Sequence, residues 1–387
     1  MNPKRLISIL SLLLSLLLSL SLCLGAAAST SASPHFAPLS ALANTWPAHI
    51  FTAPSPRING ITIAPIEDSQ LGFVGYGSPR CKMAVDELPH LGANWVSLTP
   101  FGRMENLEDT FIIHDFEIPV AQNEQYIRDT ARWAQQRGLR VALIPHLYVM
   151  SGQWRGDIDF PKAAQWTTWF AAYKQYLLRW AAVARDISAD LFSIGVEFKS
   201  TSNYHEETWR QLIAEVRQVY PGPLTYSANW DEVEQVQFWD ALDHIGINAF
   251  WPLARKPGDG YAIIRAITEM LADELEALSV FYGKPVLFTE MGIKSATDAA
   301  LAPWEWPEHL SGMRYDETYQ AMAYDAFFDA MRPRSWFSGL FIWKYFADPF
   351  DETQEALTGF TPRAKAAEAV LSRHFGAPPH TTFAPIF

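Results

Sequence analysis

From about Leu71 to the C-terminal region, short apolar segments alternate with longer amphipathic ones, and this alternation constrains the fold most strongly. The eight short segments are nearly continuous apolar runs, as expected for parallel strands that are buried on both faces. They predict strands at Gly72–Tyr76, Asn94–Thr99, Leu139–Leu147, Asp190–Glu197, Leu224–Trp230, Asp243–Phe250, Pro285–Glu290 and Phe337–Tyr345. The amphipathic segments predict helices at Lys82–Leu91, Glu124–Gln136, Ala163–Arg185, Glu206–Val219, Val233–Trp239, Ala262–Tyr282, Tyr315–Met331 and Pro362–Phe375.

Eight strands that are each followed by a helix predict an α/β fold of the (β/α)8 TIM barrel type in a single domain. The alternative is an open, doubly wound sheet. Such a sheet would carry a glycine-rich phosphate-binding turn after an early strand, and the GYGSP segment at 75–79 does not form that pattern.

The N-terminal segment predicts a secretory signal peptide over residues 1–28. Lys4 and Arg5 precede an apolar run from Leu6 to Leu24, and an Ala26-x-Ala28 pattern follows. The alternatives are a membrane anchor, since about 19 apolar residues just span a bilayer, and a lipoprotein acylated at Cys23. We expect a secreted or periplasmic protein in which Cys81 is the one remaining cysteine, so that no intramolecular disulfide forms.

The chain is then predicted to divide into three further segments. Residues 29–66, rich in Ala, Ser, Thr and Pro, predict a linker or irregular lead-in. Residues 67–378 are predicted to hold the barrel, and residues 379–387 a C-terminal tail.

Composition narrows the class of ligand. The chain has 30 Lys and Arg against 42 Asp and Glu, a formal net charge of −12. This charge disfavours a nucleic-acid or anionic-membrane partner, because neither surface attracts it at long range. Aromatic residues make up 14 % of the chain, and Tyr and Trp rings bind ligands that have apolar faces and polar edges. We therefore expect a neutral ligand such as a sugar, and a monomeric protein.

Two carboxylates end predicted strands: Glu197 ends the fourth and Glu290 the seventh. Catalytic residues of such barrels lie at the C-terminal ends of the strands, and strands four and seven lie on opposite sides of the ring. Cleavage of a glycosidic bond requires two facing carboxyl groups, one to protonate the leaving oxygen and one to attack the sugar. The alternative is that each Glu forms a structural ion pair with a nearby lysine, Lys199 or Lys294.

Other side chains near the predicted strand ends suit a sugar cleft. Trp rings offer flat apolar faces to pyranose rings, and polar groups bind hydroxyls. The candidates are Trp230, Trp251, Trp343, Arg103, His146, Asn229 and Asn248. Each of the three tryptophans and His146 is equally well explained as a core residue.

No metal or other cofactor is expected, because the chain has no H-E-x-x-H pattern and no paired His at ligand spacing. His205 with Glu206 begins a predicted helix and is expected to be solvated, and the charged stretch from Asp231 to Glu234 is predicted to be a solvated helix entry.

The strand-end motifs resemble those of clan A glycoside hydrolases, and most closely glycoside hydrolase family 113, which contains β-1,4-mannanases. The resemblance covers about residues 67–375 and rests on LGANWVSLTP, SIGVEF, INAFWPL, KPVLFTEMG and FIWKYF. It implies a retaining (β/α)8 enzyme with Glu197 as acid/base and Glu290 as nucleophile, acting on β-mannan. Another β-glycan such as cellulose or xylan, an exo-mannosidase activity, and a non-catalytic carbohydrate-binding barrel are the alternatives.

Two residues depart from the clan pattern. Many members carry Asn immediately before the acid/base, where this chain has Val196. Many also carry a Tyr near the end of strand six that bonds the nucleophile, where this chain has Phe250 and Trp251. These departures bear on the details of sugar binding more than on the chemistry.

Overall fold

The computed structural model describes residues 56–64, 73–115, 118–306, 312–351 and 353–377. Eight parallel strands close into a barrel, as predicted. Around the ring they are β1 (Ile58–Ala64), β2 (Trp95–Leu98), β4 (Arg140–Leu143), β6 (Leu191–Val196), β7 (Leu224–Asn229), β8 (Ile245–Asn248), β9 (Val286–Met291) and β10 (Phe337–Phe346).

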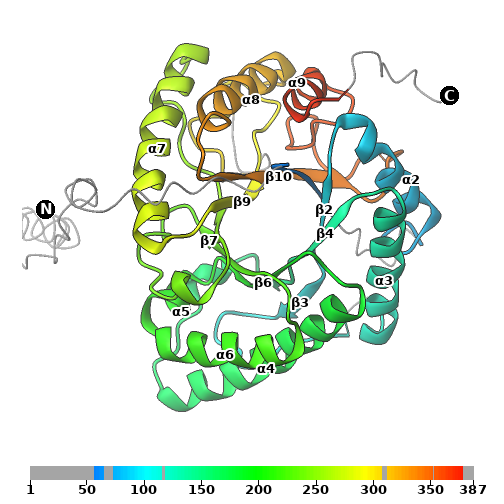
Figure 1. Cartoon of the computed structure of the whole chain (residues 1–387), viewed down its shortest axis with the longest axis vertical. Helices are drawn as coiled ribbons and strands as arrows, with labels where there is room; N and C mark the ends of the chain where they lie inside the picture. The colour runs from blue at the N-terminus through cyan, green and yellow to red at the C-terminus, as the bar shows by residue number, and fades with distance from the viewer. Residues whose placement is uncertain (1–55, 65–72, 116–117, 307–311, 352, 378–387) are drawn as a thin grey trace, which may run out of the picture. The chain divides into compact units, whose positions relative to one another are not determined.

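Helices connect the strands and surround the barrel (Figure 1). They are α2 (Pro79–Glu87), α3 (Val120–Gln136), α4 (Ala163–Asp186), α5 (Lys199–Tyr204), α6 (Glu206–Val219), α7 (Tyr261–Tyr282), α8 (Glu317–Met331) and α9 (Ala366–Phe375), with short 3-10 helices η4 (Leu88–Leu91), η5 (Arg155–Asp157) and η6 (Trp239–Ala241). Among the helices of the described residues, none has the combined length and apolar character needed to cross a membrane.

Local chemistry explains where several helices begin and end. The Ser78 side chain accepts a hydrogen bond from the Cys81 amide, and Pro79 follows, so α2 has both a cap and a first residue that suit a helix start. Gly138 follows α3 with φ +77°, a left-handed conformation that glycine adopts at little cost. The predicted end of this helix at Gln136 is confirmed.

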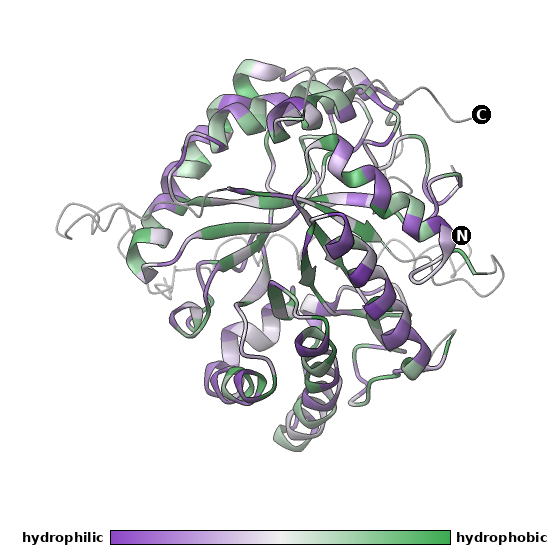
Figure 2. Ribbon diagram, turned by 45° about the vertical axis from the view of Figure 1, so that its right-hand side comes forward, coloured by the Kyte–Doolittle hydropathy of each residue, from purple (hydrophilic) through white to green (hydrophobic). Residues whose placement is uncertain are grey.

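The barrel interior is a packed core. Strands appear as apolar bands through the centre, and the helices carry polar residues on their outer faces (Figure 2). Buried side chains from β1, β2, β4, β6, β9, β10 and the residues that follow β4 form one apolar cluster: Ile58, Trp95, Ala142, Ile144, Leu191, Val196, Leu287 and Phe341. This cluster holds the strands in register below the ends that carry the candidate site.

The prediction for the first strand was wrong. The strand is β1 (Ile58–Ala64), inside the predicted lead-in of residues 29–66, and all seven of its residues are buried. Residues 73–78 form turns before α2, and the Tyr76 hydroxyl bonds the Ile63 carbonyl and the Thr99 amide. Tyr76 is therefore buried as a tie between β1 and β2 and not as a strand residue.

The predicted third strand, Leu139–Leu147, is also interrupted. Pro145 lacks an N–H for a barrel ladder, and the chain forms β4 and then β5 (His146–Val149). Pro100 separates β2 from β3 (Phe101–Met104) in the same way, and β3 pairs with β5 in a small parallel sheet. The predicted helix at Val233–Trp239 was wrong as well, since only η6 forms there. The predicted segments 1–28 and 379–387, and residues 29–55 of the lead-in, lie outside the described residues.

Candidate active site

The strand ends enclose a cavity of about 590 Å³, a size typical of small-molecule sites. It opens among the loops that follow β5, β6, β7, β8, β9 and β10. Six of the nine predicted site residues line it: Glu197, Glu290, His146, Asn229, Trp230 and Trp343. The two candidate catalytic carboxylates therefore face one common space, as the positions of strands four and seven predicted.

The other three predicted residues lie outside the cavity lining. Asn248, at the end of β8, is fully buried and donates a hydrogen bond to Glu197. Arg103, in β3, pairs through its backbone with Ile113, and its guanidinium lies 5.9 Å from the Phe101 ring centroid. Trp251 packs against Phe288, with ring centroids 5.7 Å apart. The structure thus does not bring Arg103 and Trp251 together with the catalytic candidates.

Glu197 follows β6 and is held by three N–H donors. Trp154 Nε1 and Arg155 donate to Oε2 at 3.0 and 2.9 Å, and Asn248 Nδ2 donates to Oε1 at 2.9 Å. Arg155 also donates to the carbonyls of Val196 and Leu147, at 3.0 and 3.4 Å. All three donors to Glu197 suit an ionised carboxylate, which only accepts hydrogen bonds.

Glu290 lies within β9 and is bound by His146 from β5. The distance between His146 Nε2 and Glu290 Oε1 is 2.9 Å, and both side chains are buried. The His146 ring stacks against Trp343 at a centroid distance of 6.0 Å. His146 therefore supplies a hydrogen bond to Glu290 for which the clan resemblance implied a Tyr near the end of strand six, where this chain has Phe250 and Trp251.

The hydrogen bonds of His146 limit where its protons lie. Nδ1 is 2.8 Å from the Ile144 carbonyl oxygen, which only accepts, so Nδ1 must carry a proton. A second proton is then shared between Nε2 and Glu290 Oε1. It lies on Nε2 when Glu290 is ionised, and on Oε1 when the imidazole is neutral.

The alternative ion pairs of the two glutamates with Lys199 and Lys294 do not form. Lys199 pairs with Asp231 at 2.5 Å. The Lys294 ammonium is buried and donates to three backbone carbonyls, those of Ala302, Pro303 and Glu305. The one described ion pair of Glu197 is with Arg155, a residue that the sequence analysis did not single out.

The stretch from Asp231 to Glu234 was predicted to be solvated, and for Glu232 this was wrong. Its side chain is fully buried. Oε1 accepts hydrogen bonds from the Tyr226 hydroxyl and the Asn229 amide, both at 2.9 Å, and Oε2 lies 3.2 Å from Ser202 Oγ. Burial raises the pKa of Glu232 to about 8, and the nearby charge of Glu197 adds to the effect.

Several lining residues were missed by the sequence analysis because they lie on loops and not at strand ends. They are Trp154 and Arg155 after β5, and Trp304, Glu305 and Trp306 after β9. Lys344, which lies within β10, also lines the cavity and was not singled out. The only available signal was the density of tryptophans in these loops.

His205, predicted to be solvated, instead lies against the Trp166 ring at 4.2 Å between centroids.

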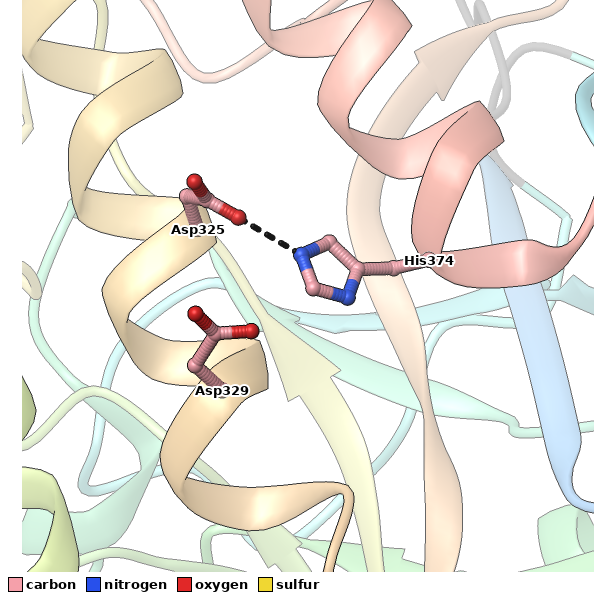
Figure 3. Close-up of side chains that lie close together, drawn as sticks. All are labelled: Asp325, Asp329 and His374. Carbon is pink, nitrogen blue, oxygen red and sulfur yellow. Dashed lines mark hydrogen bonds and ion pairs between the residues drawn. The ribbon is translucent and has the colours of Figure 1, made fainter.

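One group of three potential metal ligands occurs among the described residues, outside this cavity. Asp325 and Asp329 on α8 face His374 on α9, with ligand atoms within 4.8 Å of one another (Figure 3). Asp325 already accepts from His374 Nε2 at 2.7 Å and pairs with Arg373, and Asp329 accepts from the Tyr261 hydroxyl of α7. These contacts tie α7, α8 and α9 together.

Comparison with known proteins decides the family. A sequence profile described as Glycoside Hydrolase Family 113 matches residues 73–362, well over half of the chain. The chain belongs to glycoside hydrolase family 113. This assignment confirms the resemblance of the strand-end motifs and makes the protein a glycoside hydrolase.

Solved structures agree with the family. A GH113 β-1,4-mannanase in a complex is 26 % identical, with a TM-score of 0.72 over 83 % of this chain and 99 % of that one. The GH113 β-mannanase AaManA from Alicyclobacillus acidocaldarius, in complex with ManMIm, is 28 % identical, with a TM-score of 0.71 over 83 % and 97 %. A β-glucuronidase from Faecalibacterium prausnitzii, 17 % identical with a TM-score of 0.55 over 84 % and 50 %, shares the fold. No curated protein sequence matches the chain.

Proposed function

We propose that this glycoside hydrolase cleaves internal bonds of β-1,4-linked mannan with retention of anomeric configuration. The observation that carries the proposal is that Glu197 and Glu290 reach one cavity from opposite sides of the barrel of a family 113 chain. Two similar structures, at 26 and 28 % identity, are described as β-mannanases of this family, which supports mannan as the substrate.

In the first step the Glu290 carboxylate attacks the anomeric carbon as Glu197 protonates the leaving glycosidic oxygen. The C–O bond to the leaving sugar breaks, and a covalent bond to Glu290 forms. In the second step Glu197 removes a proton from water, which attacks the same carbon and releases Glu290. The first step takes one proton from Glu197 and the second step returns one, so Glu197 ends the cycle as it began.

The hydrogen bonds of Glu290 suit a nucleophile. Attack requires an ionised Glu290, and the shared proton then lies on His146 Nε2. A positively charged imidazolium at 2.9 Å stabilises the carboxylate and holds it in one orientation. When Glu290 becomes esterified, its charge disappears and this interaction weakens. The interaction is regained as Glu290 leaves as a carboxylate, and this favours its departure in the second step.

The donors around Glu197 suit the carboxylate that remains after it has given up its proton. Arg155 and Trp154 bind Oε2, and Asn248 binds Oε1. They stabilise the ionised form that must then act as a base on water. Asn248 also accepts from Thr289, next to Glu290, at 2.9 Å, and so ties the two catalytic strands together.

Replacement of each glutamate tests the assignment. Glu290→Ala should abolish hydrolysis of mannan, and Glu197→Ala should retain activity on aryl mannosides whose leaving group needs no protonation. The substrate panel should include mannan, glucomannan, xylan and carboxymethyl cellulose. Unchanged mannan hydrolysis by the Glu290 variant would exclude the mechanism, and preferential cleavage of xylan or cellulose would exclude the substrate.

Product analysis separates the remaining alternatives. Internal cleavage releases a range of oligosaccharides, whereas an exo-mannosidase releases mannose alone. NMR of the first product should show the β-anomer before mutarotation if the reaction retains configuration. Binding of mannan without release of reducing ends would identify a non-catalytic carbohydrate-binding protein.

We also propose that residues 1–28 direct the protein out of the cytoplasm and are removed. The positive, apolar and small-residue order of this segment supports the proposal. Mass spectrometry of protein recovered from the periplasm or medium should find an N-terminus near residue 29. An intact N-terminus would indicate a membrane anchor, and an acylated Cys23 a lipoprotein. Light scattering of the mature protein should show a monomer.

A further inference from the structure

The loop after β9 presents two exposed tryptophans to the cavity. Trp304 and Trp306 are 41 and 45 % exposed, whereas Trp169 and Trp209 are fully buried in the core. Exposing a large apolar ring to water is unfavourable, and such rings beside a cleft commonly mark a binding surface. Since both rings line the cavity that holds the two glutamates, their position is not explained by packing of the barrel.

The rings are ordered by neighbours from two other strands. Trp304 stacks on Trp230, which follows β7, with centroids 5.4 Å apart and an interplanar angle of 30°. Trp306 lies edge-on to Phe360 at 5.8 Å, and the Lys344 ammonium lies 5.1 Å from its ring centroid. The three tryptophans thus form one aromatic wall, Trp230–Trp304–Trp306, along the cavity.

Lys294 holds the loop that follows β9 through hydrogen bonds to its backbone. Its ammonium has three N–H donors, and it places them on the carbonyls of Ala302, Pro303 and Glu305 at 2.9, 3.1 and 2.8 Å. These carbonyls flank Trp304 and immediately precede Trp306. The side chain of Lys294 is fully buried, with the ammonium 5.2 Å from the Phe360 ring centroid.

A buried lysine is costly unless its charge is satisfied, so Lys294 is a poor choice for packing alone. Burial lowers its pKa to about 8, which leaves the ammonium form predominant at pH 7 and all three donors in use. Lys294 also lies four residues after Glu290 on the same segment. The loop that carries the wall is therefore fixed to the strand that carries the candidate nucleophile.

We propose that the aromatic wall Trp230–Trp304–Trp306 binds the pyranose faces of sugar residues next to the one that is cleaved, and that Lys294 is the positioning residue that holds the wall. The ligand is a neutral oligosaccharide chain, because each ring offers a flat apolar face that matches the C–H face of a pyranose. Two of the carboxylates that line the cavity are compensated within the protein, as Asp231 pairs with Lys199 and Glu197 with Arg155. The inference rests on the proposed function and adds to it a binding surface for long substrates.

The test compares a long and a short substrate in the same variants. Trp304→Ala, Trp306→Ala and Lys294→Met should each raise KM for mannohexaose by about tenfold, the order of effect found when a central aromatic contact is truncated. kcat/KM for an aryl β-mannoside, which does not reach the wall, should change less than about twofold. Tyr204→Ala and Lys174→Met are matched controls, because Tyr204 is 82 % exposed, Lys174 pairs with Glu215 on the surface, and neither lines the cavity.

Binding gives an independent readout. Calorimetry of mannohexaose on a Glu290→Gln background should show the same tenfold loss for the tryptophan variants, and these replace exposed rings, so folding should be preserved. A wild-type protein that cleaves no β-glycan would refute the proposed function. A wild-type protein that cleaves mannan, with wall and Lys294 variants indistinguishable from it on mannohexaose, would refute this inference alone. Equal losses on the long and short substrates would also refute it, since they would place the effect at the catalytic glutamates.

Discussion

Glu232 should make the protein less stable as the pH rises, and a single isosteric replacement should remove the effect. The carboxyl is fully buried, and two N–H or O–H donors converge on Oε1. In Glu232→Gln the amide oxygen accepts the same two hydrogen bonds, and the Ser202 hydroxyl, which donates to Oε2 in the wild type, can turn to accept from the amide N–H. The variant therefore keeps the network and loses only the titration.

The magnitude follows from the pKa. Burial raises the pKa of Glu232 from 4.5 to about 8. Between these values the folded state holds a proton that the unfolded state has released, so the free energy of unfolding falls as the pH rises. At roughly 1.4 kcal/mol per pH unit, the penalty is small at pH 4.5 and grows to about 3–4 kcal/mol by pH 7.5.

Urea unfolding of wild type and variant at matched pH isolates this group, because the other titrating groups are common to both. The stability advantage of Glu232→Gln over wild type should increase by about 3–4 kcal/mol between pH 4.5 and 7.5. Glu234→Gln, two residues along and exposed, is the control and should show no such increase. A difference between wild type and Glu232→Gln that stays constant with pH would show that the buried carboxyl titrates normally, and would refute the reasoning.

Three further replacements test the contacts of the proposed catalytic pair. Arg155→Met removes a donor that binds both Glu197 and the Val196 carbonyl, so kcat/KM for mannan should fall by roughly tenfold or more, and an unchanged kcat/KM would show that Arg155 does not position Glu197. His146→Phe removes the hydrogen bond to Glu290, so kcat/KM for mannan should fall by roughly tenfold or more, and an unchanged kcat/KM would show that His146 does not position Glu290. Tyr226→Phe deletes a hydroxyl that accepts from the Phe198 amide at 2.7 Å and donates to Glu232, so urea unfolding should show a loss of about 1–3 kcal/mol together with a lower kcat.

Most of the barrel could be predicted because its strands are buried on both faces. Such strands read as apolar runs whatever their neighbours are, and seven of the eight were placed in the correct region. The exception, β1, follows a segment rich in Ala, Ser and Pro, and its INGITIA sequence contains two residues, Asn59 and Gly60, that disfavour strands. Asn59 is satisfied by long-range bonds to Asn94 and to the Phe375 carbonyl, which sequence reasoning cannot supply.

The candidate site could be predicted only as far as it lies on strand ends. Glu197 and Glu290 stand out because a carboxylate at the end of an apolar strand is costly without a purpose. Arg155, Trp304 and Lys294 lie on loops, where charged and aromatic residues are ordinary and their partners are set by how the loop folds back. Glu232 was misread for the same reason, because a charged stretch shows no sign of which member turns inward.

The backbone at Glu197 connects these loop contacts with catalysis. Glu197 has φ +54°, and the other non-glycine residues with positive φ in the described chain, Ser188, Asp298 and Ala364, do not line the cavity. A left-handed conformation at such a residue costs about 1–3 kcal/mol, and it persists only where neighbouring contacts enforce it. Here the Glu197 amide donates to the Ser227 carbonyl at 2.8 Å. The Phe198 amide donates to the Tyr226 hydroxyl, and that hydroxyl donates in turn to Glu232. The buried Glu232 carboxyl therefore stabilises the turn that aims Glu197 into the cavity, and the stability that is lost through its burial at neutral pH is part of the cost of placing the proposed catalytic acid.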